Sequence, residues 1–228
     1  MSPRRSTSLS RSVEDYLKAV YALTERGEPA ATSALAEALD IQPASVTGMI
    51  KRLDDEGFVE HVPYRGVRLT EAGSREALRI IRRHRVLETY LTNRLGYSWD
   101  DVHYEAERLE HAASDELIDR MAAALEDPSH DPHGAPIPTR AGEIAPTDFV
   151  PLADAPEGVA LEIKAVQDED SELLRSMESL GLRPGALITI VSRTPLYGPL
   201  SVTVEGDEVT GEIIAHELAE RIFVRWSA

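Results

Sequence analysis

The densest group of metal-binding side chains lies in the nine-residue segment from His103 to His111. An α-helix advances about 100° per residue, so a helix over this segment would place four of them on one face: His103, Glu107, Glu110 and His111. Two imidazoles and two carboxylates on one face are ligands for a divalent cation. Upstream, His84 and Glu88 are four residues apart and form a second pair on one helix face.

Two other interpretations of this segment stay open. One is a solvated helix face with ion pairs, for which Arg108 supplies a cation. The other is a metallohydrolase, but the short helical zinc motifs carry two histidines and Glu107 stands where the second is required. The chain also lacks a nucleophile elbow, a phosphate-binding glycine loop and a dinucleotide fingerprint. We therefore expect a protein that is not an enzyme and has no small organic substrate.

A second group of residues is typical of a helix that contacts DNA. Between Pro43 and Glu56 the residues Val46, Met49, Ile50 and Leu53 form an apolar stripe, which leaves small, hydroxyl and basic side chains facing outward. Small residues let a helix enter the major groove, and basic residues neutralise phosphates. With flanking positions, the candidate DNA contacts are Thr32, Gln42, Pro43, Ala44, Ser45, Thr47, Gly48, Lys51, Arg52 and Arg65. The alternative is a helical hairpin that only packs.

The elements around this helix follow a recognisable order. The periodicity predicts helices over 12–23, 32–39 and 43–56, and alternating residues predict strands over 58–62 and 67–70 with a turn between them. Three helices followed by a small hairpin indicate a winged helix-turn-helix, which we place at residues 1–73.

The remainder of the chain is first helical and then β-rich. A long helical pattern covers 71–95, and one or two more helices with an apolar stripe fall within 100–125. We assign 74–140 to a helical domain, whose apolar stripe needs a partner in cis or from a second subunit, and 141–155 to a linker. About five short strands and one helix then predict a small SH3-like barrel at 156–228. The fold class is multidomain and mainly α.

Composition narrows the possible partners. There is no cysteine, no secretory signal and no apolar run long enough to cross a membrane, so we expect a cytoplasmic protein without a membrane partner. The net charge of −16 is unevenly distributed: residues 1–95 hold 15 basic and 13 acidic residues, whereas 96–228 hold 9 and 27. The front half could therefore approach phosphates, and the rear half would repel them.

Several motifs, taken together and in this order, resemble the diphtheria toxin repressor and manganese transport regulator family of metal-dependent transcription factors. They lie at 13–17, 43–47, 64–70, 83–88, 102–111 and 132–138. The resemblance covers nearly the whole chain. It implies a homodimeric repressor with a winged helix, a helical dimerisation and metal-binding domain at 74–140, and the SH3-like (FeoA-like) third domain of longer members.

The resemblance also implies two metal sites. The primary regulatory site falls on Asp15, Glu107, Glu110 and His111. The ancillary site falls on His84, Glu88 and His103, and its further candidates are Asp168, Asp170, Glu172 and His133. In iron-type members the third domain supplies ligands to the ancillary site. Leu173 stands at the position of the second of these ligands and cannot bind a metal, so the resemblance does not give a complete ligand set for this site.

The residues of the primary site predict the metal. Iron-type members have Met and Cys where this chain has Asp15 and Glu107, and replacing soft ligands by carboxylates favours Mn²⁺. Lys18 stands where two-domain manganese members have a glutamate that helps hold a metal pair. We predict Mn²⁺, with Fe²⁺ as the alternative and other divalent transition metals substituting in vitro.

The predicted ligands come from two different regions of the chain, which suggests how a bound metal would act. Asp15 belongs to the first helix of the DNA-binding region, whereas Glu107, Glu110 and His111 belong to the dimerisation region. A cation joining them would restrict their relative motion, and two recognition helices in a dimer would then match successive major grooves of a palindromic operator. The expected partner is therefore double-stranded DNA.

Overall fold

The computed structural model describes residues 9–25, 27–62, 64–167, 170–205 and 210–226. These residues form two compact units. The first contains the chain up to Arg83 with Glu110–Ala113 and Pro138–Ile144, and the second contains His84–Leu109, Ser114–Ile137 and the chain from Ala145. Among the described helices, none is long and apolar enough to cross a membrane.

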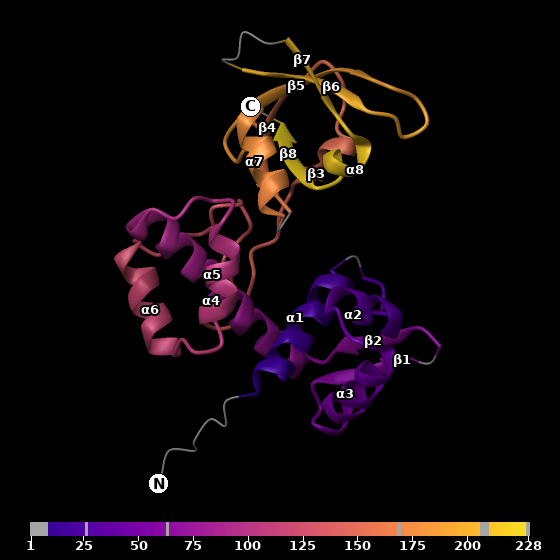
Figure 1. Cartoon of the computed structure of the whole chain (residues 1–228), viewed down its shortest axis with the longest axis vertical. Helices are drawn as coiled ribbons and strands as arrows, with labels where there is room; N and C mark the ends of the chain where they lie inside the picture. The colour runs from indigo at the N-terminus through magenta and orange to yellow at the C-terminus, as the bar shows by residue number, and fades with distance from the viewer. Residues whose placement is uncertain (1–8, 26, 63, 168–169, 206–209, 227–228) are drawn as a thin grey trace. The chain divides into compact units, whose positions relative to one another are not determined.

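The first unit is a winged helix-turn-helix, as predicted. It contains α1 (Arg11–Thr24), α2 (Thr32–Ala38), α3 (Pro43–Asp55), and the hairpin of β1 (Val59–Val62) and β2 (Gly66–Leu69) (Figure 1). Pro43 at the first turn of α3 favours helix initiation there. The apolar stripes of the three helices meet in one core that includes Leu17, Leu35 and Val46, all fully buried.

The hairpin is fixed to the segment before α2. Ala30 and Val67 form an isolated antiparallel bridge, with each backbone N–H donating to the other's carbonyl oxygen. Gly66 has φ 121°, and a Cβ there would lie 2.0 Å from the carbonyl oxygen of Ala30. Only glycine allows this close approach, so the wing depends on that residue.

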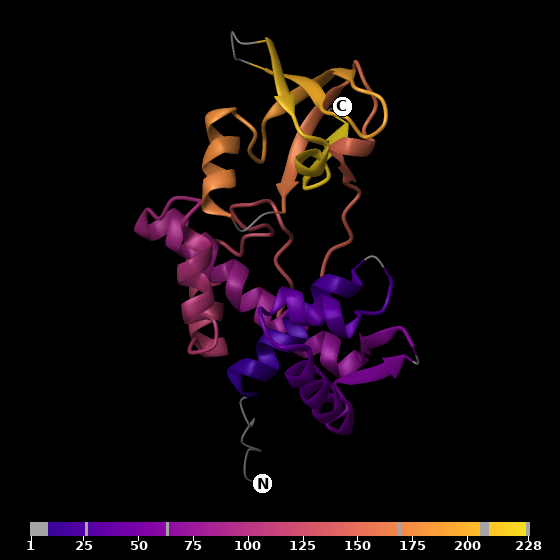
Figure 2. The same ribbon diagram turned by 45° about the vertical axis from the view of Figure 1, so that its right-hand side comes forward.

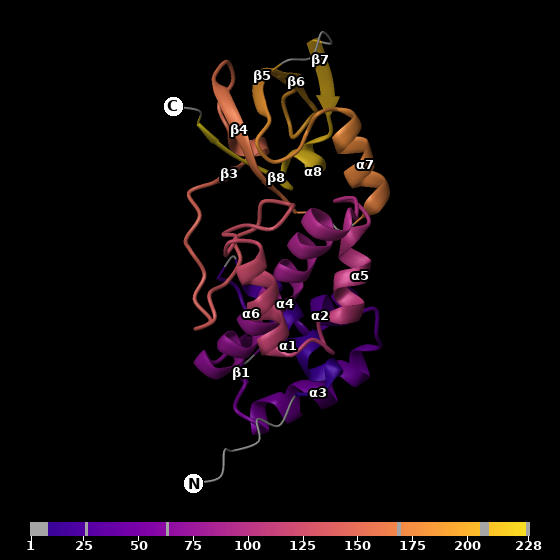
Figure 3. The same cartoon turned by 90° about the vertical axis from the view of Figure 1, so that its left-hand side faces the viewer.

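Helices open the second unit. The long helix α4 (Glu71–Leu95) begins in the first unit, and its residues from His84 onward belong to the second, with α5 (Val102–Leu109) and α6 (Asp115–Ala124). Figure 3 shows α5 and α6 beside α4. Ser114 caps α6 by accepting a hydrogen bond from the backbone N–H of Leu117.

A six-stranded antiparallel sheet completes the second unit. Its order is β3-β8-β4-β5-β6-β7. Alternate side chains of β5 and β6 point into the core, and bulges in β4, β5 and β6 bend the strands, as a small barrel requires. Helix α7 lies at one side of the sheet and buries Leu174 and Met177 in the same core (Figure 2). The elements are β3 (Val150–Pro151), η1 (Leu152–Asp154), β4 (Ala160–Val166), α7 (Ser171–Ser179), β5 (Leu187–Arg193), β6 (Leu200–Val204), β7 (Thr210–Ile214), α8 (His216–Ala219) and β8 (Ile222–Trp226).

The structure differs from the sequence prediction at the start of this domain. We predicted a linker over 141–155, but β3 pairs with β8, and Leu152, Ala153 and Ala155 are buried in the barrel core. The run of apolar residues is too short to show strand periodicity, and the prolines and acidic residues around it are typical of a loop. Its burial depends on β8, about 70 residues later in the chain.

Candidate metal centre

Two distant segments of the first unit meet in a cluster of possible metal ligands. Asp15 comes from α1, and Glu110 and His111 come from the turn that follows α5. The Nε2 atom of His111 lies 2.9 Å from Asp15 Oδ1 and 3.4 Å from Glu110 Oε1. Each residue thus offers one ligand atom within 4.8 Å of the other two.

The chemistry of this cluster fits a cation. His111 Nε2 is buried and makes no hydrogen bond of acceptable geometry to any described group, although it lies close to two carboxylates. A buried ring nitrogen needs a partner, and a metal ion shared with Asp15 and Glu110 would provide one. The set of two carboxylates and one imidazole would hold a borderline or hard divalent ion there.

Glu14 positions the imidazole from the opposite side. Its Oε2 lies 2.6 Å from His111 Nδ1, and its Oε1 accepts a hydrogen bond from Arg83 Nη1 at 3.1 Å. A proton held on Nδ1 leaves the lone pair on Nε2, which is the tautomer that a metal requires. Glu14 was not among the predicted site residues, although a carboxylate beside the apolar stripe of α1 was a signal for it.

The end of α5 corrects one sequence expectation. We expected a single helix through 103–111, but α5 ends at Leu109, and Glu110 and His111 lie in the next turn. Glu107 is on α5 in the second unit, where its carboxylate lies 4.0 Å from His103 Nε2. Its role as a ligand of the primary site stays a prediction.

A second cluster is buried within the second unit. Glu88 Oε1 lies 2.8 Å from His84 Nε2 and 3.3 Å from His103 Nδ1. The two imidazole nitrogens are 3.2 Å apart. All three residues are buried, so the structure brings together the three main predicted ancillary residues.

The loop after α6 adds two more groups to this cluster. His133 Nδ1 lies 3.7 Å from Glu88 Oε2, and its Nε2 is 2.7 Å from the carbonyl oxygen of Trp99. Asp131 groups with Glu88 and His133, and its carboxylate lies 3.5 Å from Arg85 Nε. His133 was one of the predicted candidates, whereas Asp131 was not predicted.

Burial and charge perturb the titration of this cluster. Burial opposes ionisation of Glu88, but the surrounding His84, His103 and His133 hold its pKa well below the ordinary value. Burial also disfavours protonation of His133, but the hydrogen bond to Glu88 and its charge outweigh that effect and raise the pKa of His133. Burial, followed by the charge of Glu88, raises the pKa of Asp131 to about 6. Perturbed pKa values of this kind are concentrated at functional sites.

The remaining ancillary candidates have different positions. Asp170 is the N-cap of α7, and its Oδ1 accepts hydrogen bonds from the backbone N–H groups of Glu172 and Leu173. Asp170 and Glu172 also line a cavity of about 510 Å³ that His103 borders. Asp168 lies outside the described residues.

The predicted DNA-contacting surface of α3 is open to solvent. Val46, Ile50 and Leu53 of α3 are buried, whereas Gln42 and all the predicted DNA-contacting residues of α3 are exposed. These exposed residues of α3 are Pro43, Ala44, Ser45, Thr47, Gly48, Lys51 and Arg52. Thr32 is half-buried at the start of α2. Arg65 is exposed at the wing and forms an ion pair with Glu28.

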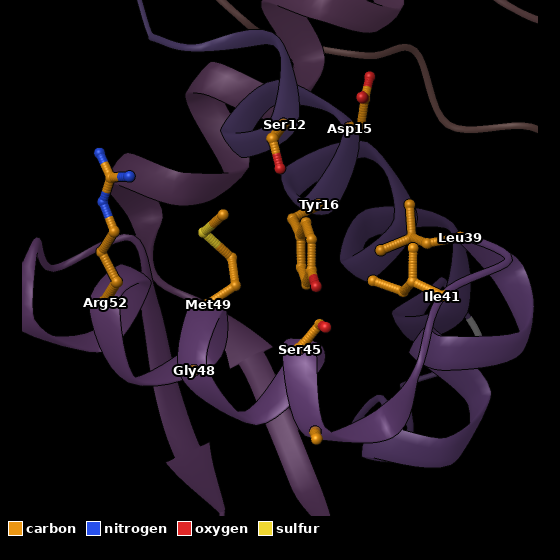
Figure 4. A pocket seen from close by; sticks show the side chains of 10 residues that line it. Ser12, Asp15, Tyr16, Leu39, Ile41, Ser45, Gly48, Met49 and Arg52 are labelled. Carbon is orange, nitrogen blue, oxygen red and sulfur yellow. The ribbon is translucent and has the colours of Figure 1, made fainter.

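A cavity lies between α1, which carries Asp15, and the predicted recognition helix α3. It measures about 500 Å³ and is bordered by Asp15 and Tyr16 of α1 and by Ser45, Gly48 and Met49 of α3. Figure 4 shows Tyr16 opposite Ser45 and Met49, with Asp15 at the rim. Met49 was predicted to be buried, but it is only half-buried because it borders this cavity.

Three family models match consecutive parts of the chain. Residues 8–67 match the N-terminal DNA-binding domain of iron-dependent repressors, and residues 70–139 match their metal-binding and dimerisation domain. Residues 150–225 match the FeoA domain.

Individual relatives match the chain over different lengths. The iron-dependent repressor IdeR of Mycobacterium tuberculosis is 30% identical over 224 residues, which is 92% of this chain and 95% of that protein. The regulator MntR of Oceanobacillus iheyensis is 38% identical over 110 residues, covering 48% of this chain and 74% of that one. A solved manganese-dependent transcriptional repressor in complex with manganese superposes with a TM-score of 0.88 at 34% identity, covering 94% of this chain and all of that one.

Proposed function

Because the chain belongs to the diphtheria toxin repressor family of metal-dependent, DNA-binding transcriptional repressors, we propose that it is a manganese-responsive repressor of manganese-uptake genes. Members of this family are repressors and not enzymes, so the metallohydrolase interpretation is set aside. Its DNA-binding and dimerisation domains indicate that it binds an operator as a homodimer. We further propose a palindromic operator and a cytoplasmic location.

The convergence of Asp15, Glu110 and His111 is the observation that supports manganese. Two of these ligands are carboxylates, and the chain contains no cysteine that could supply a thiolate. Oxygen-rich sites suit Mn²⁺, whereas thiolates favour softer metals. We include Glu107 as a fourth ligand of this site.

The buried cluster of His84, Glu88 and His103 is the second metal site that we propose. His133 extends it through Glu88, and Asp170 and Glu172 border the neighbouring cavity. Its nitrogen content exceeds that of the first site, so we expect it to accept a wider range of divalent ions.

The proposed mechanism connects the first site to DNA through α1. A cation bound by Asp15 and by Glu110 and His111 would join α1 to the turn after α5. Leu17 and Val20 of α1 lie in the same core as Val46 and Ile50 of α3, so fixing α1 also fixes the recognition helix. Interiors pack too densely for one helix to shift alone. Metal binding would therefore set the geometry of the DNA-binding surface.

Fluorescence anisotropy with DNA from upstream of the protein's own gene tests the metal preference. The metal-free protein is titrated with that DNA in chelator, and then with Mn²⁺, anaerobic Fe²⁺ and Zn²⁺ at matched free concentrations. Strongest activation by Mn²⁺ supports the proposal. Activation by Fe²⁺ at lower free concentration than Mn²⁺ would favour an iron-responsive repressor, as the full-length similarity to IdeR suggests.

A further inference from the structure

A lysine side chain lies inside the acidic centre. Lys18 is on α1, three residues after Asp15, and its Nζ lies 3.1 Å from Glu110 Oε1 and 3.4 Å from Oε2. The Lys18 side chain is 24% exposed, whereas Glu110 is fully buried. Helix α1 therefore contributes both a carboxylate ligand and a positive charge to the same centre.

Glu110 needs a positive charge nearby. A buried carboxylate loses its hydration, and a paired cation is the usual compensation. The ammonium group of Lys18 provides this compensation, and it donates hydrogen bonds to both carboxylate oxygens. Lys18 is thus a cationic partner of Glu110 within this centre.

A divalent ion would compete with that ammonium group. When Glu110 becomes a metal ligand, two positive charges would lie within a few ångströms of each other, at a distance where like charges repel strongly in a partly buried site. The ammonium group would therefore have to move away from Glu110 when the metal binds. Breaking its contact with Glu110 raises the metal concentration that the centre needs.

We propose that Lys18 is an internal counter-cation of the centre and sets the manganese concentration at which the centre fills. This inference rests on the proposed function, in which Asp15, Glu110 and His111 hold the regulatory ion. It gives Lys18 two effects: the lysine stabilises the metal-free protein and weakens metal binding.

Calorimetric titration of the full-length, metal-free protein with Mn²⁺ tests the second effect. Lys18→Gln removes the charge at similar length, and its dissociation constant for Mn²⁺ should fall on the order of 10- to 100-fold. Lys18→Arg retains the charge and should stay near wild type. Lys164→Gln, in the second unit, controls for the loss of one positive charge elsewhere. Unchanged or weaker Mn²⁺ binding by Lys18→Gln would overturn the proposal, since Lys18 would then only position Glu110.

Thermal unfolding tests the first effect. In chelator, the midpoint of Lys18→Gln should lie below that of wild type, because a buried carboxylate loses its cation. With saturating Mn²⁺ the two midpoints should converge. Equal midpoints in chelator would contradict the role of Lys18 as a counter-cation.

Chemical labelling observes the lysine directly. The chain has three lysines, Lys18, Lys51 and Lys164, so their acetylation rates can be compared in one digest. Mn²⁺ should raise the rate at Lys18 severalfold relative to the other two. A rate at Lys18 that is unchanged or lowered by Mn²⁺ would overturn the proposal, because the ammonium group would then stay beside Glu110.

An Asp15→Asn variant separates this inference from the proposed function. If wild type and Asp15→Asn bind Mn²⁺ equally, the ion is elsewhere and the proposed function fails. If Asp15→Asn binds more weakly but Lys18→Gln matches wild type, only the inference about Lys18 fails.

Discussion

Both ring nitrogens of His111 have defined surroundings, which places this residue at the centre of the proposed first metal site. Nδ1 faces Glu14, and Nε2 faces Asp15 and Glu110. Because Arg83 holds Glu14 in turn, the imidazole is oriented before any metal arrives. An oriented ligand loses less conformational freedom on binding than a free one.

Replacing Glu14 should weaken this orientation. We expect Glu14→Gln to reduce manganese affinity about 10-fold, because the carboxylate that fixes the tautomer of His111 is lost. Calorimetry of the metal-free variant measures the change. Glu37→Gln, at an exposed position of α2, is the matched control, and equal affinities for the two variants would show that Glu14 is not needed.

Replacing Glu107 tests the prediction that this residue is a ligand of the first metal site. If Glu107 binds the ion, Glu107→Cys adds a thiolate and should shift activation of DNA binding from Mn²⁺ toward Fe²⁺ and Zn²⁺. The measurement is operator affinity against free metal concentration. Glu105→Cys, two residues earlier on α5, controls for a new thiol, and an unchanged metal preference in Glu107→Cys would exclude Glu107 as a ligand.

The second cluster predicts a pH dependence for the metal-free protein. The pKa of His133 is raised above its ordinary 6.5, so its contribution to stability is fully present below that value and is lost as the pH rises through the raised pKa. Thermal midpoints in chelator from pH 6 upward, for wild type and His133→Gln, should therefore converge as the pH rises. A difference that stays constant or grows with pH would contradict this assignment.

At the scale of elements, α1 has two roles on two faces. One face carries Asp15 and Lys18 at the metal centre, and the other carries Leu17 and Val20 in the core shared with α3. The apolar periodicity of the sequence predicts the buried face correctly. The role of Lys18 could not be predicted from spacing alone, because its partner Glu110 lies 92 residues away.

The wing gives a prediction about electrostatics. Arg65 pairs with Glu28 and Arg68 donates to the carbonyl oxygen of Gly27, so the loop before α2 holds both wing arginines. DNA phosphates would have to compete with Glu28 for Arg65. We expect Glu28→Gln to tighten binding to all DNA sequences alike, and Arg65→Ala to weaken binding and lower the salt slope by about 1.

Anisotropy titrations over a series of salt concentrations measure both effects of the wing. Glu217→Gln, at an exposed position in the barrel domain, controls for the change in net charge. Loss of binding by Arg65→Ala only on the specific operator would show that the wing contacts bases instead of phosphates.

Helices were easier to predict from this sequence than the places where they end. The stripes of α1, α3 and α4 predicted these helices, whereas the end of α5 at Leu109 left no signal that spacing could reveal. Glu110 and His111 lie in the turn directly after that end. The burial of Leu152 was missed for a similar reason, since its partner strand β8 is distant in sequence.

At the scale of the whole molecule, charge is divided along the sequence. The first 95 residues hold 15 basic and 13 acidic residues, whereas the remaining 133 hold 9 basic and 27 acidic residues. Phosphates are attracted by local charge more than by the average, so a net charge of −16 is compatible with DNA binding. Acidic residues elsewhere would instead keep the rest of the molecule away from the DNA backbone.

Trp99 joins the helical and β-rich parts of the second unit. Its ring lies in the core of the barrel domain, and its carbonyl oxygen is the partner of His133 Nε2. Asp100 adds contacts to α7, since its carbonyl oxygen accepts from Ser171 and its carboxylate pairs with Arg175. The proposed second metal site is therefore in direct contact, through His133, with the segment that packs against the barrel.

The central claim is that a metal held by Asp15, Glu110 and His111 controls DNA binding. The most direct test compares operator affinity with Mn²⁺ and with chelator, for wild type and for Asp15→Asn. The account predicts that Mn²⁺ tightens wild-type binding by about 5- to 150-fold, the range of typical coupling between sites, and that Asp15→Asn loses this response. Equal wild-type affinity in chelator and in Mn²⁺ would contradict the account.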